Sequence, residues 1–141
     1  MRASIAVFSV SAALLLAGCA SLQDHSKDKM RDDTLDSYAA TLRWGDFGSA
    51  YQFVDPEVRA KHPQDAATKA KYNKVTVAEY DAQPPAATGE NTLSQMVQIS
   101  LIEKASQSSY NIVDHQNWRW DPVAKHWWLE SGLPDITPQQ Q

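Results

Sequence analysis

The chain has a single cysteine, Cys19, among its 141 residues, so no disulfide can form within it. Its five glycines form neither a glycine-rich phosphate loop nor a nucleophile elbow. The 13 Lys and Arg are outnumbered by 17 Asp and Glu. Without a basic stripe, the sequence argues against a nucleic-acid-binding surface.

Histidines are also few and widely spaced, which argues against a metal site. The four are His25, His62, His115 and His126. Metal ligands usually recur at helical or hairpin spacing, and only the last two could approach each other, across a hairpin. We therefore expect no metal and no cofactor.

The one long apolar run is at the N-terminus, from Ile5 to Leu16, after the positive start Met1-Arg2. It is too short to span a bilayer, which needs about 20 apolar residues. A positive start, a short apolar run and small residues before a cleavage point are typical of a secretory signal.

The end of this run, Leu16-Ala17-Gly18-Cys19, resembles the lipobox of bacterial lipoproteins. In that family the cysteine receives a diacylglycerol, the bond before it is cleaved, and the new amino terminus is usually acylated. The resemblance implies a signal peptide at 1–18 and a membrane anchor at Cys19. Two alternatives remain, an ordinary signal peptide with a chance cysteine and an uncleaved N-terminal helix.

The residue after the cysteine bears on the destination. Ala20 is not aspartate, the residue that signals inner-membrane retention in the enterobacterial rule. The resemblance therefore implies the outer membrane, facing the periplasm.

Removing the signal takes Arg2 and no acidic residue, which changes the formal net charge from −4 to −5. Such a domain is not attracted to anionic lipid, so attachment must come from the acyl chains. We expect a polar tether at 19–29, one domain at 30–134 and a flexible tail at 135–141.

Helical periodicity marks the start of the domain. Apolar residues recur at i, i+3, i+4 and i+7, namely Leu35, Tyr38, Ala39 and Leu42. Trp44-Gly45 predicts the end of this helix, and Asp46 predicts the N-cap of a shorter one that Asp55-Pro56 stops. Residues 57–72 are ambiguous, with a marginal surface helix predicted after Pro63.

The second half is predicted to be β-structure. Strands are expected at 74–80, 96–102, 110–120 and 126–130, with a loop at 83–89 and a turn at 121–125. The fold class is thus α+β, with amphipathic helices packed on a curved antiparallel sheet.

This arrangement resembles the NTF2-like superfamily of cone-shaped α+β domains over about 30–134. The segments that carry the resemblance are 38–47, 53–56, 118–120 and 126–129. It implies a sheet that wraps the helices around a cavity. The chain departs from the pattern at 57–72, where an early strand pair is not evident, and another small helix-plus-meander fold is the alternative.

NTF2-like domains include isomerases and dehydratases as well as non-catalytic modules, so the fold does not assign an activity. An enzyme of this kind needs an acid or base and an oxyanion donor in the cone. The weak candidates are Asp114, His115 and Tyr38. Asp114 is predicted to share a strand face with Trp118, although a bulge or an exposed stretch of strand would also explain it.

Four tryptophans near the C-terminus are candidates for binding: Trp118, Trp120, Trp127 and Trp128. Alternation places Trp127 and Trp128 on opposite faces of one strand, so one should be exposed or lie in a groove. Exposed tryptophan is enriched in binding hot spots. Cross-strand aromatic pairing, which stabilises a hairpin by about 0.5–1 kcal/mol, is the alternative.

The sequence therefore predicts a membrane-anchored periplasmic lipoprotein that acts as a non-catalytic module. It would bind an envelope protein or a small apolar ligand. The alternatives are an accessory subunit of an envelope complex and an isomerase- or dehydratase-type enzyme that uses Asp114.

Overall fold

The computed structural model describes residues 17–139, with side chains described from Leu22 onward. Most of the predicted signal peptide, 1–16, therefore lies outside the described part. No described helix is long and apolar enough to cross a membrane. The fold begins with a 28-residue helix, α1 (Ala17–Trp44), which ends at the predicted residue.

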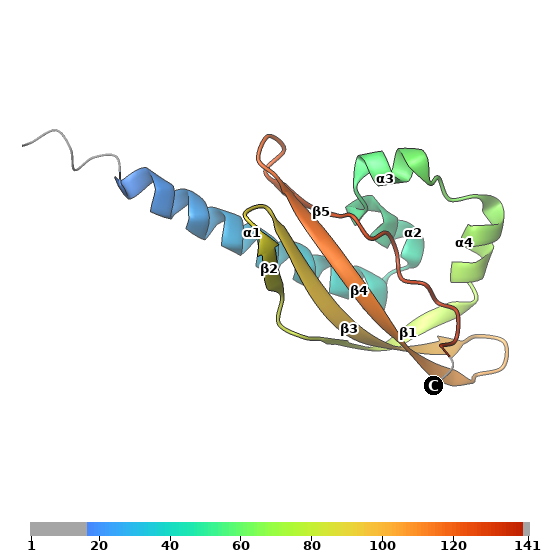
Figure 1. Ribbon diagram of the computed structural model, residues 1–141. Helices are drawn as coiled ribbons and strands as arrows, with labels where there is room; N and C mark the ends of the chain where they lie inside the picture. Colours follow the sequence, from blue (N-terminus) through green and yellow to red (C-terminus); the bar gives the residue numbers. More distant parts are fainter. Residues whose placement is uncertain (1–16, 140–141) are drawn as a thin grey trace, which may run out of the picture.

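Short helices follow α1, and then strands continue almost to the C-terminus (Figure 1). The helical elements are α2 (Phe47–Ala50), the 3-10 turn η1 (Tyr51–Phe53), α3 (Pro56–Lys61) and α4 (Ala66–Tyr72). The strands are β1 (Val75–Ala82), β2 (Ala86–Gly89), β3 (Thr92–Glu103), β4 (Ser109–Asp121) and β5 (His126–Leu129).

All five strands form one antiparallel sheet, in which β1, β3, β4 and β5 are neighbours in that order and β2 also pairs with β3. Bulges interrupt the register between Val77 and Glu79 and between Ala87 and Gly89. Because bulges bend a strand and increase its twist, they help the sheet to curl. Helix α1 contacts both β1 and β5, at the two ends of this order. The α+β prediction, with a helix on a curved antiparallel sheet, is confirmed.

The core lies between α1 and the concave face of the sheet. Leu35, Tyr38 and Leu42 of α1 are buried, which is the apolar stripe that the helical spacing predicts. Alternate residues along the middle of β3 and β4 are also buried, since strand side chains alternate between faces.

The predicted tether at 19–29 is helical and continuous with the first domain helix. No glycine or proline interrupts the chain from Cys19 to Trp44. Ion pairs one turn apart also support the helix, Lys29–Asp33 at 2.5 Å and Arg31–Asp28 at 3.0 Å. The sequence did not predict this part of the helix, because residues 19–29 are polar and no apolar stripe begins before Met30.

Helix α1 is fastened to the sheet from Lys27 onward, slightly before the predicted boundary. The Lys27 ammonium donates to the Glu90 carbonyl at 2.6 Å and to the Asn91 side chain at 2.8 Å, both in the β2–β3 turn. Trp127 Nε1 donates to the Lys27 carbonyl at 3.3 Å. The earlier turns of α1 project away from the sheet (Figure 1).

The structure resolves one ambiguous segment and corrects one predicted loop. The surface helix predicted after Pro63 is present as α4, which has no buried residue. The ambiguous 57–72 region forms α3 and α4, whose N-caps Asp55 and Asp65 accept hydrogen bonds from Glu57 N and Thr68 N. The expected loop at 83–89 contains the short strand β2, which is exposed along its length and so lacks an alternating pattern.

The tail predicted to be flexible is packed as far as the described chain extends. Ile136 is only 3% exposed, and its carbonyl accepts a 2.7 Å hydrogen bond from the Tyr110 hydroxyl. The Tyr72 hydroxyl donates to the Pro134 carbonyl at 2.9 Å. These contacts, together with the Lys71–Asp135 ion pair, hold the C-terminal segment on the domain.

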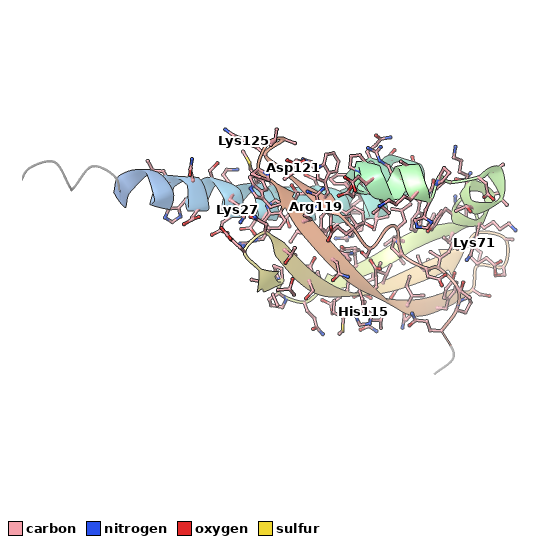
Figure 2. The ribbon with its side chains drawn as sticks, turned by 45° about the horizontal axis from the view of Figure 1, so that its top comes forward. Lys27, Lys71, His115, Arg119, Asp121 and Lys125 are labelled. Atoms are coloured by element: carbon pink, nitrogen blue, oxygen red, sulfur yellow. The ribbon has the colours of Figure 1, made fainter. Side chains whose placement is uncertain are left out.

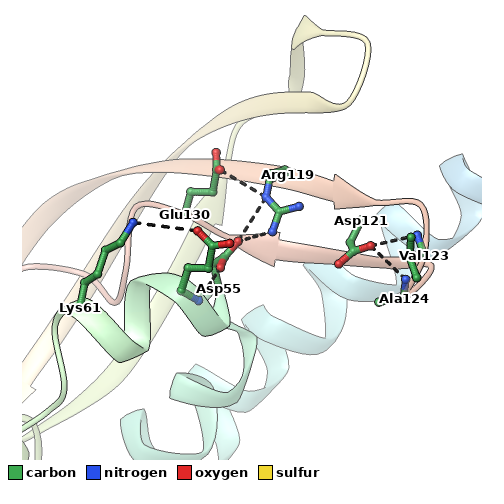
Figure 3. A network of polar contacts seen from close by, with 8 residues as sticks. Asp55, Lys61, Arg119, Asp121, Val123, Ala124 and Glu130 are labelled. Carbon is green, nitrogen blue, oxygen red and sulfur yellow. Dashed lines mark hydrogen bonds and ion pairs between the residues drawn. The ribbon is translucent and has the colours of Figure 1, made fainter.

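An ion pair joins the helical segment to the end of the sheet (Figure 3). The nearly buried Asp55 accepts hydrogen bonds from Arg119 Nη2 at 2.5 Å and Nε at 3.2 Å. Its backbone N–H donates to the Leu129 carbonyl at 2.9 Å. Burial raises the pKa of Asp55, but Arg119 and the Glu57 N–H outweigh it, so the net pKa is lowered.

We predict that Asp55→Asn lowers the free energy of unfolding by about 1–2 kcal/mol at pH 7, between the effects typical of exposed and buried ion pairs. Because asparagine can still act as the N-cap of α3, the decrease in the free energy of unfolding measures the loss of the Asp55–Arg119 ion pair. Because the folded-state pKa is lowered, this stability is present above the ordinary pKa of aspartate and is lost as pH falls through the folded value.

Urea unfolding at pH 7 and near pH 3 measures this effect. The matched control is Asp46→Asn, which changes an N-cap that forms no ion pair with a described residue. Equal losses in the two variants at pH 7, or a loss for Asp55→Asn that does not become smaller from pH 7 to pH 3, would contradict the assignment.

Candidate functional site

A chain of hydrogen bonds runs along the concave face of the sheet. Gln116 Nε2 donates to the Tyr80 hydroxyl at 2.9 Å and to Asp114 Oδ2 at 2.8 Å. Trp118 Nε1 donates to Gln116 Oε1 at 3.2 Å. The β4 members are alternate residues and therefore point to the same side, while Tyr80 comes from β1. Gln116 is the centre of this network, a role that sequence reasoning missed.

Tyr38 enters the same interior from α1. It is fully buried, and its ring packs edge-on against Phe53 and Trp118, with centroids 5.5 and 5.3 Å away. Its hydroxyl has no hydrogen-bond partner among the described residues. Burial, and then the charge of Asp114, raise the pKa of Tyr38 well above its usual value.

Asp114 is also perturbed. Burial raises the pKa of its carboxyl, against the opposing effects of the Gln116 hydrogen bond and the His115 charge. The structure thus places Asp114 and Tyr38, which the sequence named only as separate weak candidates, in one interior. A carboxyl with a raised pKa beside a buried phenol is a combination that acid–base catalysis can use.

Large aromatic side chains pack in this interior, and three hollows lie at the surface of the described chain. A hollow of about 330 Å³ between α1 and β1 is lined in part by Leu35, Trp44 and Tyr80. A larger one of about 770 Å³ lies among α2, α3 and α4, and another of about 360 Å³ adjoins Trp127. Neither Tyr38 nor Asp114 lines any of them. Trp118, with no exposed surface, occupies space that a cavity would need.

His115 lies on the opposite face of β4 and is exposed (Figure 2). It therefore cannot act together with Asp114 on a substrate held inside the sheet. In the described part of the chain, no group of three or more His, Cys, Asp or Glu side chains could hold a metal ion. Cys19 belongs to α1, and its side chain lies outside the described part.

The candidate tryptophans divide between the two faces of the sheet. Trp118 and Trp127 are buried, whereas Trp120 is half-buried, with its ring centroid 5.6 Å from that of its cross-strand partner Trp127. Trp128 is half-buried on the outer face, with its ring 4.1 Å from that of His126. The aromatic pairing alternative therefore accounts for Trp120 and Trp127.

The most exposed described tryptophan is Trp44, at 80%, which sequence reasoning treated only as a helix terminator. The Arg43 guanidinium carbon lies 5.1 Å from its ring centroid. The exposure of Trp44 could have been predicted from the sequence. Helical spacing places Trp44 outside the apolar face defined by Leu35, Tyr38 and Leu42.

A scan against protein-family models and a search of curated proteins found no match to this chain. The function must therefore be argued from the residues and their geometry.

Tyr38→Phe tests whether the buried Tyr38 hydroxyl lacks a hydrogen-bond partner. Because the Tyr38 hydroxyl is buried without a partner, its removal should leave the free energy of unfolding unchanged or raise it by about 1 kcal/mol. Tyr38→Ala should lower it by about 3–5 kcal/mol by opening a cavity.

Thermal and urea unfolding of the variants give these values. Tyr72→Phe is the matched control, because the Tyr72 hydroxyl does donate a hydrogen bond and its removal should destabilise. A loss on Tyr38→Phe as large as that on Tyr72→Phe would show that the Tyr38 hydroxyl has a partner in solution.

Proposed function

We propose that the protein is a lipoprotein anchored through Cys19 at the periplasmic face of a bacterial outer membrane. The domain would act as a non-catalytic binding or accessory module. The observation that carries this proposal is the sequence Leu16-Ala17-Gly18-Cys19, which resembles a lipobox. The structure adds that α1 runs without a break through Cys19 to Trp44. After cleavage at the lipobox, the lipidated residue would stand at the head of the helix whose other end forms the core.

A continuous α1 would restrict how far the domain lies from the membrane and how it is oriented. From Cys19 to Lys27, where α1 is fastened to the sheet, the helix rises by about 12 Å. A helical stalk of this length would hold the domain close to the membrane with a limited range of orientations. A flexible peptide of the same residues would not restrict orientation in this way.

We further propose that the domain is NTF2-like. The supporting features are the two-helix start with its Gly45-Asp46 corner and a curled antiparallel sheet that ends in the tryptophan-rich β4–β5 hairpin. The helices at 57–72 and the filled interior distinguish it from a member with an open cone. This filling favours the binding module over the enzyme that would use Asp114.

For a protein partner, Trp44 is a better candidate contact than the tryptophans of the hairpin. It is exposed, and it lines the 330 Å³ hollow between α1 and β1 together with Leu35 and Tyr80. Large exposed aromatic side chains beside a hollow are typical of interaction hot spots. Trp128 on the outer face is the second candidate.

Cys19→Ser tests the anchor. The variant should lose incorporation of labelled palmitate and should accumulate as an uncleaved precursor, because the lipoprotein signal peptidase acts on the lipidated cysteine. Ala20→Ser keeps the thiol and serves as the control, with labelling unchanged. A wild-type chain that is cleaved but unlabelled would instead indicate an ordinary secretory signal.

A further inference from the structure

Positive charge is concentrated in one helical segment of an otherwise acidic protein. Residues 56–74 hold five Lys or Arg against two Asp or Glu. The rest of the chain after the predicted signal holds seven against fifteen. This segment contains α3 and α4, which border the 770 Å³ hollow.

The hollow combines cations with aromatic and amide groups. Its lining includes Arg59 and Lys69, the rings of Tyr51 and Tyr72, and the amides of Gln52 and Gln64. Its volume is within the range of about 300–1,000 Å³ that is common for small-molecule sites.

The two cations in the hollow are not neutralised by described residues. Arg59 Nε is buried without a hydrogen-bond acceptor, and its guanidinium carbon lies 6.0 Å from the Tyr51 ring centroid. Neither Arg59 nor Lys69 forms an ion pair within the described chain, although nearby Lys61 and Lys71 pair with Glu57 and Asp135.

One carboxylate, that of Asp46, also lines the hollow. It is already engaged as the N-cap of α2, since it accepts a 2.6 Å hydrogen bond from Ser49 N and a 3.1 Å bond from Ser49 Oγ. Asp46 forms no ion pair with Arg59 or Lys69 within the described chain, so the hollow has two unpaired positive groups against one negative group.

We propose that the hollow among α2, α3 and α4 binds a small organic anion that carries a carboxylate or phosphate. Arg59 supplies a charge-assisted hydrogen bond through its terminal guanidinium N–H groups, since its planar fork suits either oxyanion. Lys69 supplies a second positive charge. The two tyrosine rings and the amides contact the uncharged part of the ligand.

The position of the hollow among α2, α3 and α4 favours a soluble anion over a lipid headgroup as the ligand. The hollow begins at Asp46, directly after α1, and so lies about 40 Å along that helix from Ala17. In Figure 1, α3 and α4 lie at the opposite end of the molecule from the start of α1. This step rests on the proposed anchor at Cys19, whereas binding of the anion itself does not.

The test uses the full chain in nanodiscs, titrated separately with inorganic phosphate and with succinate while amide chemical shifts are recorded. With phosphatidylcholine nanodiscs, at least one probe should shift amides within residues 51–73. The double variant Arg59→Gln/Lys69→Gln should raise the Kd about tenfold or more, the result of losing one strong charge-assisted contact.

The matched control is Lys104→Gln/Lys125→Gln, which removes the same charge from exposed positions outside the hollow and should change Kd less than about twofold. If Arg59→Gln unfolds the chain, Lys69→Gln alone should still weaken binding, since Lys69 is exposed. No shift with either probe, or equal weakening in the two double variants, would overturn the site.

A second arm distinguishes the source of the anion. Nanodiscs that contain phosphatidylglycerol should leave residues 51–73 unshifted, and shifts there would overturn the choice of a soluble anion. Failure of the anchor proposal would appear separately, as an unlabelled wild-type chain.

Discussion

The packing of α1 inside the curled sheet is the contact on which the rest of the fold depends. This helix touches both β1 and β5, so one rod meets strands at the two ends of the β1–β3–β4–β5 order. Tyr38 and Trp118 fill the space between helix and sheet. Burial of large aromatic side chains is a strong source of stability in a domain without a disulfide. The same aromatic packing occupies the interior that holds Asp114.

The sequence predicted those features that depend on periodicity. The stripe from Leu35 to Leu42, the N-cap at Asp46 and the alternation along β4 all follow from local geometry. Alternation also placed Asp114 on the inner face, but it cannot say whether that face encloses a cavity or a packed core. The burial of Ile136 depends on contacts with residues distant in sequence, which no local pattern encodes.

The proposed anchor, Cys19, lies near the N-terminal end of α1. The hollow that contains Arg59 and Lys69 lies beyond the C-terminal end of the same helix. Lys27 and Trp127 fix the helix to the sheet, and the Asp55–Arg119 ion pair ties the segment that leads to α3 to the same sheet. Through these two contacts the hollow has a defined position relative to α1, and so to the proposed anchor at Cys19. A rigid link of this kind would present a ligand site at a set distance from the membrane, with no conformational change required.

The continuity of α1 is the central claim, and a distance between two spin labels tests it most directly. Cys19 is expected to be blocked by lipid, so Gln23→Cys and Ala40→Cys can be labelled selectively in the full chain in nanodiscs. A continuous helix separates these two backbone positions by about 26 Å. Pulsed electron resonance should give one narrow distribution consistent with that separation. A broad distribution would show that the turns before Lys27 are a flexible tether and would contradict the account.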